Sequence, residues 1–246
     1  MSAILPVTAI ATETPPPVTA MTPVLVEEHD ASGALLLRST MAGGVLHGPL
    51  EQFGAGGVPA MTAHFEDGKL HGPMALYNAD GVLVQRSAFQ RGTVHGLVET
   101  FIHGRWVTAQ TMADGVASGP SLSFDEAGQM TSRLHLVGGQ VEGPAIFYHE
   151  GRQVRGAAYR AGLLEGESID YDAEGLVVQR CTYRANLLHG PLRRYWPSGA
   201  LMEEVMYRDG VPLGAPVRFD AQGARIGNAE AAPALFERIK RLLRGD

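Results

Sequence analysis

The chain has 246 residues, of which 31 are glycine and one is cysteine, and its net charge is −6. A single thiol, Cys181, cannot form an internal disulfide, so we expect a small packed residue there. The acidic balance, with no cluster of Lys or Arg before the C-terminus, argues against nucleic acid as a partner. No apolar run reaches the roughly 18 to 20 residues that cross a bilayer. The N-terminus lacks the positive region of a secretory signal, so we expect a cytoplasmic protein.

Residues 1–30 are rich in Thr, Pro, Ala and Val and contain the run Pro15-Pro16-Pro17. Proline favours extended geometry and removes backbone donors, so the composition predicts a flexible arm. Val24 to Val26 are a candidate edge strand at its end, and a docking arm for a partner is the alternative function.

Residues 31–226 are predicted to form an array of about eight repeats of 23 to 24 residues. One glycine, called the unit glycine, marks each repeat. Successive unit glycines are 24 residues apart, except for two intervals of 23, and both missing residues fall at the same turn position of the repeat. Its positions are Gly48, Gly72, Gly96, Gly119, Gly143, Gly166, Gly190 and Gly214. A fixed period of this kind predicts a repeat architecture stabilised by contacts between neighbouring units.

A second glycine precedes the unit glycine by four residues in every repeat except one, where Asn186 replaces it. Asn is the residue that best tolerates the left-handed region after glycine. The substitution therefore predicts a positive φ at this position of the turn.

Segments of five to eight residues rich in Val, Leu, Thr and aromatics lie between the glycines, and an aromatic residue follows every unit glycine by five positions. Short segments bounded by turn residues are typical of hairpin strands. The pattern predicts an all-β fold: one elongated antiparallel sheet of tandem β-hairpins, twisted and coiled along its length.

Residues 227–246 break the repeat and place Leu235, Ile239 and Leu242 on one helical face, with Pro233 at an early helical position. We expect an amphipathic α-helix that caps the open edge of the last hairpin. The alternative is a basic helix that docks a partner or an anionic membrane.

The unit Gly68-Lys69-Leu70-His71-Gly72-Pro73, with Tyr77 and Gly81 after it, resembles the MORN repeat in the bacterial variant of the YwqK-like antitoxin family. The resemblance covers about residues 33 to 225. It implies an antitoxin or immunity-type protein that neutralises a cognate bacterial toxin, often a secretion-system effector. Other MORN proteins are associated with membrane lipids and scaffolding, so a lipid-associated scaffold or adaptor is the alternative.

Histidine precedes the unit glycine in half of the repeats, at His47, His71, His95 and His189. Equivalent positions in consecutive repeats lie two strands apart, about 9.6 Å, which is too far for imidazoles to share one zinc ion. We therefore predict turn packing or a backbone hydrogen bond at these positions, with no metal and no cofactor.

No repeat carries a nucleophile with a base or two convergent carboxylates, so we predict that the protein is not an enzyme. The acidic groups Asp125-Glu126, Asp170-Tyr171-Asp172 and Glu203-Glu204 lie in turns or alternate across strands. We interpret them as solvated surface.

Residues that break the repeat are the candidate contacts for a protein partner, with local packing as the alternative for each. Tryptophan and arginine are enriched in interface hot spots. The candidates are Trp106, Arg193, Arg194 and Trp196, together with a row of arginines in alternate repeats, Arg38, Arg86, Arg133 and Arg180. The row would place cations about 19 Å apart on one face and suit an acidic elongated partner or a lipid surface, although chance could also produce it.

Overall fold

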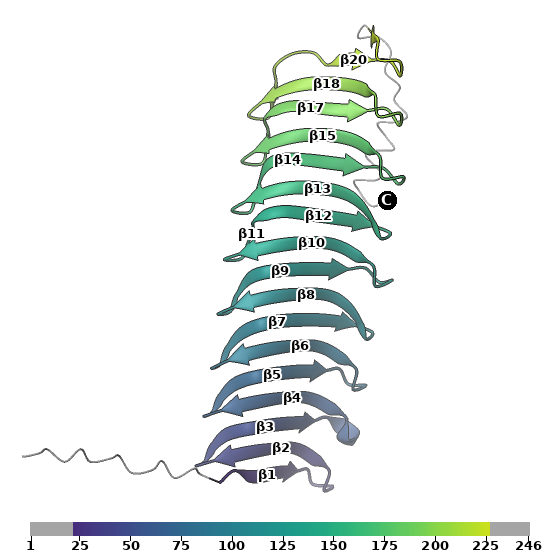
Figure 1. The fold of residues 1–246 in the computed structure, drawn as a ribbon. Helices are drawn as coiled ribbons and strands as arrows, with labels where there is room; N and C mark the ends of the chain where they lie inside the picture. The colour runs from purple at the N-terminus through teal and green to yellow at the C-terminus, as the bar shows by residue number, and fades with distance from the viewer. Residues whose placement is uncertain (1–21, 227–246) are drawn as a thin grey trace, which may run out of the picture.

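The computed structural model describes residues 22–226, which form one open sheet of 21 antiparallel strands (Figure 1). Each hairpin pairs with the next along the chain, so the sheet is a continuous meander that grows into a long stack. Strands β10 (Met130–Val137), β15 (Val177–Arg184) and β18 (Leu201–Arg208) each pair with two consecutive short strands. The predicted all-β array of tandem hairpins is confirmed. Most of the N-terminal arm and the predicted helix at residues 227–246 lie outside the described residues.

The strands are short and regular. The first nine are β1 (Val24–His29), β2 (Leu35–Ala42), β3 (Val45–Phe53), β4 (Pro59–Glu66), β5 (Lys69–Tyr77), β6 (Leu83–Gln90), β7 (Thr93–Ile102), β8 (Arg105–Ala113) and β9 (Val116–Phe124). The remaining strands are β10 (Met130–Val137), β11 (Gln140–Val141), β12 (Gly143–His149), β13 (Arg152–Arg160), β14 (Leu163–Tyr171), β15 (Val177–Arg184), β16 (Leu187–Leu188), β17 (Gly190–Tyr195), β18 (Leu201–Arg208), β19 (Val211–Pro212), β20 (Val217–Phe219) and β21 (Arg225–Ile226). A 3-10 turn, η1 (Ala55–Gly57), lies between β3 and β4, and there is no α-helix within residues 22–226.

Strand β1 comes from the end of the N-terminal segment and pairs with β2. It covers the candidate edge strand Val24 to Val26 and continues to His29. The described part of the chain contains no helix long and apolar enough to cross a bilayer.

Along one edge of the sheet, the left edge in Figure 1, two-residue turns connect the two strands of each hairpin. Asp67 and Gly68, between β4 and β5, have φ of 48° and 75°. Two consecutive positive φ values match the right-handed twist of the flanking strands. Asn186 has a φ of 67°, which confirms the conformation predicted from its replacement of glycine.

Turns of the opposite edge usually contain five residues. In residues 78–82, the Asn78 side chain accepts hydrogen bonds from the backbone N–H of Asp80 and Val82, which closes the loop on itself. The two short repeats have instead the two-residue turns 103–104 and 150–151. Both deletions therefore lie at the same turn position of the repeat, as predicted.

The unit glycine occupies a bulge where the register of the pairing shifts by two residues: Gln110 pairs with Ser121, whereas Met112 pairs with Ala117. At Gly119 the φ is 120°, and a Cβ atom there would lie 2.9 Å from the Cβ of Thr111. Only glycine combines this backbone with so little space. In three repeats the bulge divides one long strand into two short ones, β11/β12, β16/β17 and β19/β20.

The described sheet has no second layer, so most of its core is a central row of small and aliphatic side chains on one face, while Ala109 is buried on the other. The row arises from one repeated cross-strand pair. The residue two positions after a unit glycine pairs with the residue nine positions before the following unit glycine, as Leu50 pairs with Ala63. Its buried members are Ser39, Leu50, Ala63, Ser87, Ala145, Ala157, Ser168, Cys181, Leu192 and Val205. Cys181 is 2% exposed, which confirms the expected small packed residue.

Candidate binding surface

Side chains two residues apart on a strand share a face of the sheet, and this sorts the candidate residues into two groups. One face, the arginine face, carries Arg38, Arg86, Arg133, Arg180 and Arg193. The other, the ladder face, carries the buried row and, on six successive main strands, Arg155, Asp170, Gln179, Arg194, Glu203 and Arg218. The strand register defines both groups.

Glutamates on adjacent strands neutralise most of the arginine row. Arg38 lies 2.9 Å from Glu27 and 3.2 Å from Glu51. Arg86 Nε lies 2.6 Å from Glu99 Oε2, and this glutamate is buried. These pairs join strands within the sheet, so the row contributes less free charge than its arginines alone suggest.

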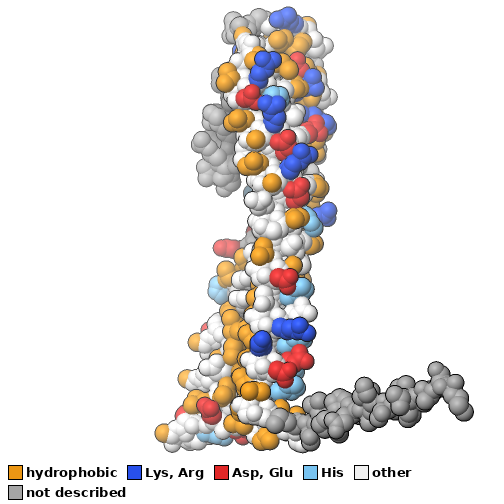
Figure 2. Space-filling view, turned by 90° about the vertical axis from the view of Figure 1, so that its left-hand side faces the viewer, with side chains coloured by type: hydrophobic (Ala, Val, Ile, Leu, Met, Phe, Trp, Pro, Cys, Tyr) orange, Lys and Arg blue, Asp and Glu red, His pale blue; other side chains and the backbone are white. Residues whose placement is uncertain are grey.

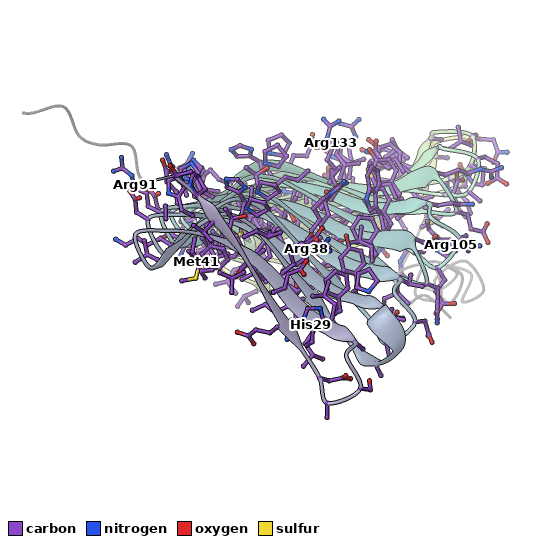
Figure 3. All side chains as sticks on the ribbon, turned by 90° about the horizontal axis from the view of Figure 1, so that it is seen from below. His29, Arg38, Met41, Arg91, Arg105 and Arg133 are labelled. Atoms are coloured by element: carbon purple, nitrogen blue, oxygen red, sulfur yellow. The ribbon has the colours of Figure 1, made fainter. Side chains whose placement is uncertain are left out.

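The other two arginines of the row differ from each other. Arg180 pairs with Glu167 at 3.1 Å. Arg133 faces Leu122 and Ile146 on the adjacent strands, is exposed, and forms no ion pair with any residue in the range 22–226. In Figure 3, Arg91 marks one edge of the sheet and Arg105 marks the other. Arg38 and Arg133 lie between these two edges.

The sequence neighbours Arg193 and Arg194 lie on opposite faces, so they do not form one cluster. Arg193 Nε lies 2.6 Å from Glu204 Oε2 on the arginine face. Trp196 lies at the start of the next turn, and its indole Nε1 donates a hydrogen bond to the carbonyl of Phe219 at 3.1 Å. This contact ties β17 to β20, which supports local packing as one role of Trp196.

Trp106 is exposed, with 47% of its surface open to solvent. Its ring lies 5.7 Å from that of Phe124, and both line a surface hollow of about 670 Å3 with Ile102, Arg105 and Glu126. Arg105 Nη1 donates to the Glu126 carbonyl at 2.7 Å. The hollow thus has an exposed aromatic wall and a polar rim.

A second hollow, of about 740 Å3, lies two repeats further along the same edge. Arg152 Nη1 donates to the Ala173 carbonyl at 2.6 Å, and Tyr171 lines the wall. Both hollows follow the two-residue turns of the short repeats. A shorter turn leaves space beside the five-residue turn of the next hairpin, and the arginine fills part of it.

The ladder face holds a chain of polar side chains that the sequence analysis missed. Arg155 Nε lies 2.7 Å from Asp170 Oδ1, and Gln179 Nε2 donates to Asp170 Oδ2 at 3.1 Å. Arg194 in turn donates to Gln179 Oε1 at 3.1 Å. The partners are cross-strand neighbours, so each link connects one strand to the next.

This series of polar side chains continues into the last repeats. Arg194 Nη1 pairs with Glu203 Oε1, and Arg218 Nε lies 2.9 Å from Glu203 Oε2. Asp170 and Glu203 are both buried, which corrects their interpretation as solvated surface. Burial raises the pKa of Asp170, and Arg155 opposes part of this rise. The available sequence signal was the concentration of charged residues at alternate strand positions after residue 150.

Three of the four histidines contact the turn of the next hairpin, whereas His71 Nδ1 lies 3.1 Å from Glu66 Oε2 within its own hairpin. His47 Nδ1 accepts from the Asp67 backbone N–H at 3.4 Å, and His95 Nδ1 accepts from that of Asp114 at the same distance. These contacts confirm the predicted backbone hydrogen bond at both positions. His189 Nδ1 lies 3.2 Å from Asp209 Oδ1.

Glutamate performs the same role where it replaces histidine. The Glu142 carboxylate accepts from the Ala161 backbone N–H at 2.7 Å, and Glu165 accepts from Ala185 at 2.9 Å. In these four repeats the position therefore supplies an acceptor for the next turn. Among residues 22–226, no three His, Cys, Asp or Glu side chains converge as metal ligands would.

Comparison with known proteins places one segment in a family. Residues 188–209, from the end of β16 through β18, match the model of the MORN repeat variant. No curated protein matches the chain. A MORN repeat within an all-β hairpin array is typical of repeat-type binding scaffolds rather than of enzymes.

Proposed function

We propose that the protein is a non-catalytic scaffold that binds a partner protein in the cytoplasm, as an antitoxin or immunity protein neutralising a cognate bacterial toxin or secreted effector. The scaffold role follows from the repeat architecture and the MORN match. The antitoxin role rests on the resemblance of the repeated unit to the YwqK-like family.

The hollow at Trp106 is the observation that carries the proposal. An exposed tryptophan beside a second aromatic ring and an exposed aliphatic, Ile102, has the composition of an interface hot spot. Local packing would bury such side chains. Here they remain open to a partner.

Co-expression with neighbouring reading frames, followed by co-purification and a growth assay, tests the proposal. We expect a stable complex with one neighbour and rescue of its toxicity. W106A should weaken that complex at least tenfold, because truncating an anchor residue costs about 1.4 kcal/mol or more. L97A is the matched control, since Leu97 is also 47% exposed but lies outside the hollow. Failure to find any complex or rescue would reject the antitoxin role.

A lipid-associated scaffold is the second candidate. Exposed cations beside exposed aliphatic residues at the tight turns favour it, because such surfaces suit the interface of an anionic bilayer. Flotation with anionic liposomes at low salt tests it, and a protein that stays in the dense fraction would reject this candidate.

A further inference from the structure

The last three tight-turn hairpins share a feature that the earlier ones lack: an arginine before the turn faces an aliphatic residue after it. The pairs are Arg160 with Leu163, Arg184 with Leu187, and Arg208 with Val211, and these six residues are called the basic edge below. Earlier hairpins have Ala42 with Val45, Glu66 with Lys69, Gln90 with Thr93, Ala113 with Val116, and Val137 with Gln140 at the same positions.

The basic edge is open to solvent. Leu163, Leu187 and Val211 are 42%, 48% and 62% exposed. Figure 2 looks directly at the tight-turn edge and shows Lys and Arg side chains over its upper part, with Asp and Glu among them and hydrophobic side chains beside them. A Cβ atom at Gly210 would lie 3.5 Å from Leu187 Cδ2, so successive hairpins are in contact and the surface is continuous.

Two of the three arginines have no carboxylate partner. Arg160 and Arg208 form no ion pair with any residue that the structure describes, whereas Arg184 Nη2 lies 2.8 Å from Asp209 Oδ1. The nearby carboxylates of Glu142 and Glu165 are directed at turn amides. The arginine face, in contrast, pairs three of its four row arginines with glutamates.

The spacing of the basic edge selects the conformation of a ligand. Equivalent residues of adjacent hairpins are two strands apart, about 9.6 Å. A polyproline II segment places every third residue on one side at intervals of about 9.3 Å. An α-helix repeats its side chains after seven residues at about 10.5 Å, and an extended strand turns every third residue to the opposite side.

We propose that the basic edge binds an extended, polyproline II segment of a partner protein that carries Asp or Glu at every third position. Each acidic side chain pairs with one arginine, and the residues between them contact Leu163, Leu187 and Val211. Guanidinium and carboxylate groups form two parallel hydrogen bonds, which gives the pairing a defined register. This inference rests on the proposed role as a protein-binding scaffold and assigns that role a surface.

An anionic membrane fits the basic edge less well. A cation near such a membrane contributes about 1 kcal/mol, and the basic edge has three cations in a single row with Asp209 among them. That charge recruits a protein weakly. A bilayer also has no fixed spacing to match.

Fluorescence anisotropy with labelled twelve-residue peptides tests the inference. The probe is four repeats of Glu-Pro-Leu. One control has the same composition with glutamates out of the three-residue spacing, and another has glutamine in place of glutamate. We expect the probe to bind at least tenfold more tightly than either control. Equal affinity for the two spacings would overturn the inference.

Matched variants assign the binding to the basic edge. R160Q/R184Q/R208Q should lose at least tenfold in affinity, whereas R38Q/R86Q/R180Q, with the same change in net charge, should stay within twofold. D209N should bind the probe more tightly, because it frees Arg184. Equal losses in both triple variants would reduce the effect to general electrostatics and overturn the inference.

Two further measurements separate the remaining outcomes. If the basic edge were required for binding anionic vesicles but did not bind the probe peptide, its ligand would be a membrane and the peptide inference would be overturned. A complex with the toxin that R160Q/R184Q/R208Q leaves intact would refute the basic edge as its site while the scaffold role stands.

Discussion

Arg155 and Asp170 face each other across β13 and β14, with Arg155 Nε 2.7 Å from Asp170 Oδ1. The Asp170 side chain is only 4% exposed. A buried carboxylate is tolerated because a guanidinium and the Gln179 amide both face it. The pair is therefore a point where a single substitution has a large effect.

R155M should lower the free energy of unfolding by about 3 kcal/mol, because it leaves the buried carboxylate of Asp170 without its cation. Urea denaturation monitored by circular dichroism measures the change. R180M is the matched control: Arg180 and Glu167 are both exposed, and such a pair contributes about 0 to 1 kcal/mol. The double variant R155M/D170N should recover most of the loss. A double variant as unstable as R155M would contradict the role assigned to the pair.

The stability contribution of Asp170 should decrease as pH rises. Burial raises its pKa above the ordinary value of 3.8, so the folded protein binds this proton more tightly than the unfolded chain does. The contribution is complete below pH 3.8 and is lost as pH rises through the folded-state pKa. Urea denaturation from pH 3 to 8 should show the unfolding free energy of the native protein falling relative to that of D170N across this window. A rise would show that Arg155 outweighs burial.

Replacing the unit glycine should cost more than replacing a turn glycine. G119A places a Cβ atom 2.9 Å from that of Thr111 at a φ of 120°, and we expect a loss of about 3 kcal/mol. G128A also has a positive φ, 80°, but no atom within 4 Å, so about 1 kcal/mol is expected. Thermal and urea unfolding compare the two variants. Equal losses would mean that the close approach to Thr111 contributes nothing.

Glu142 should be replaceable by histidine but not by alanine. E142A removes the acceptor of the Ala161 N–H and should cost about 0.5 to 1 kcal/mol, since a solvent-accessible hydrogen bond contributes little more. At pH 8, where an ordinary imidazole is neutral, E142H should retain most of the native stability through Nδ1. Denaturation midpoints of both variants at pH 8 provide the measurement. If E142H were as unstable as E142A, histidine and glutamate would not be equivalent here.

For the candidate partner contacts, the sequence predicted some positions correctly and grouped others wrongly. The exposed position of Trp106 agrees with its selection as a residue that breaks the repeat. Arg193 and Arg194 were grouped because they are adjacent in the chain, yet strand alternation directs them to opposite faces. The basic edge passed unnoticed because Arg160, Arg184 and Arg208 each lie 24 residues apart and become one surface only when the hairpins stack.

The amino-acid sequence by itself determined the hairpins, the turn that absorbs the deletions and the positive φ at Asn186, because these are local requirements of the backbone. Only the tertiary structure decided which charges meet. Arg38 and Glu51 are 13 residues apart and Arg155 and Asp170 are 15 apart, and their contact depends on strand register. The bulge at the unit glycine shifts that register by two residues, which changes every cross-strand partner beyond it.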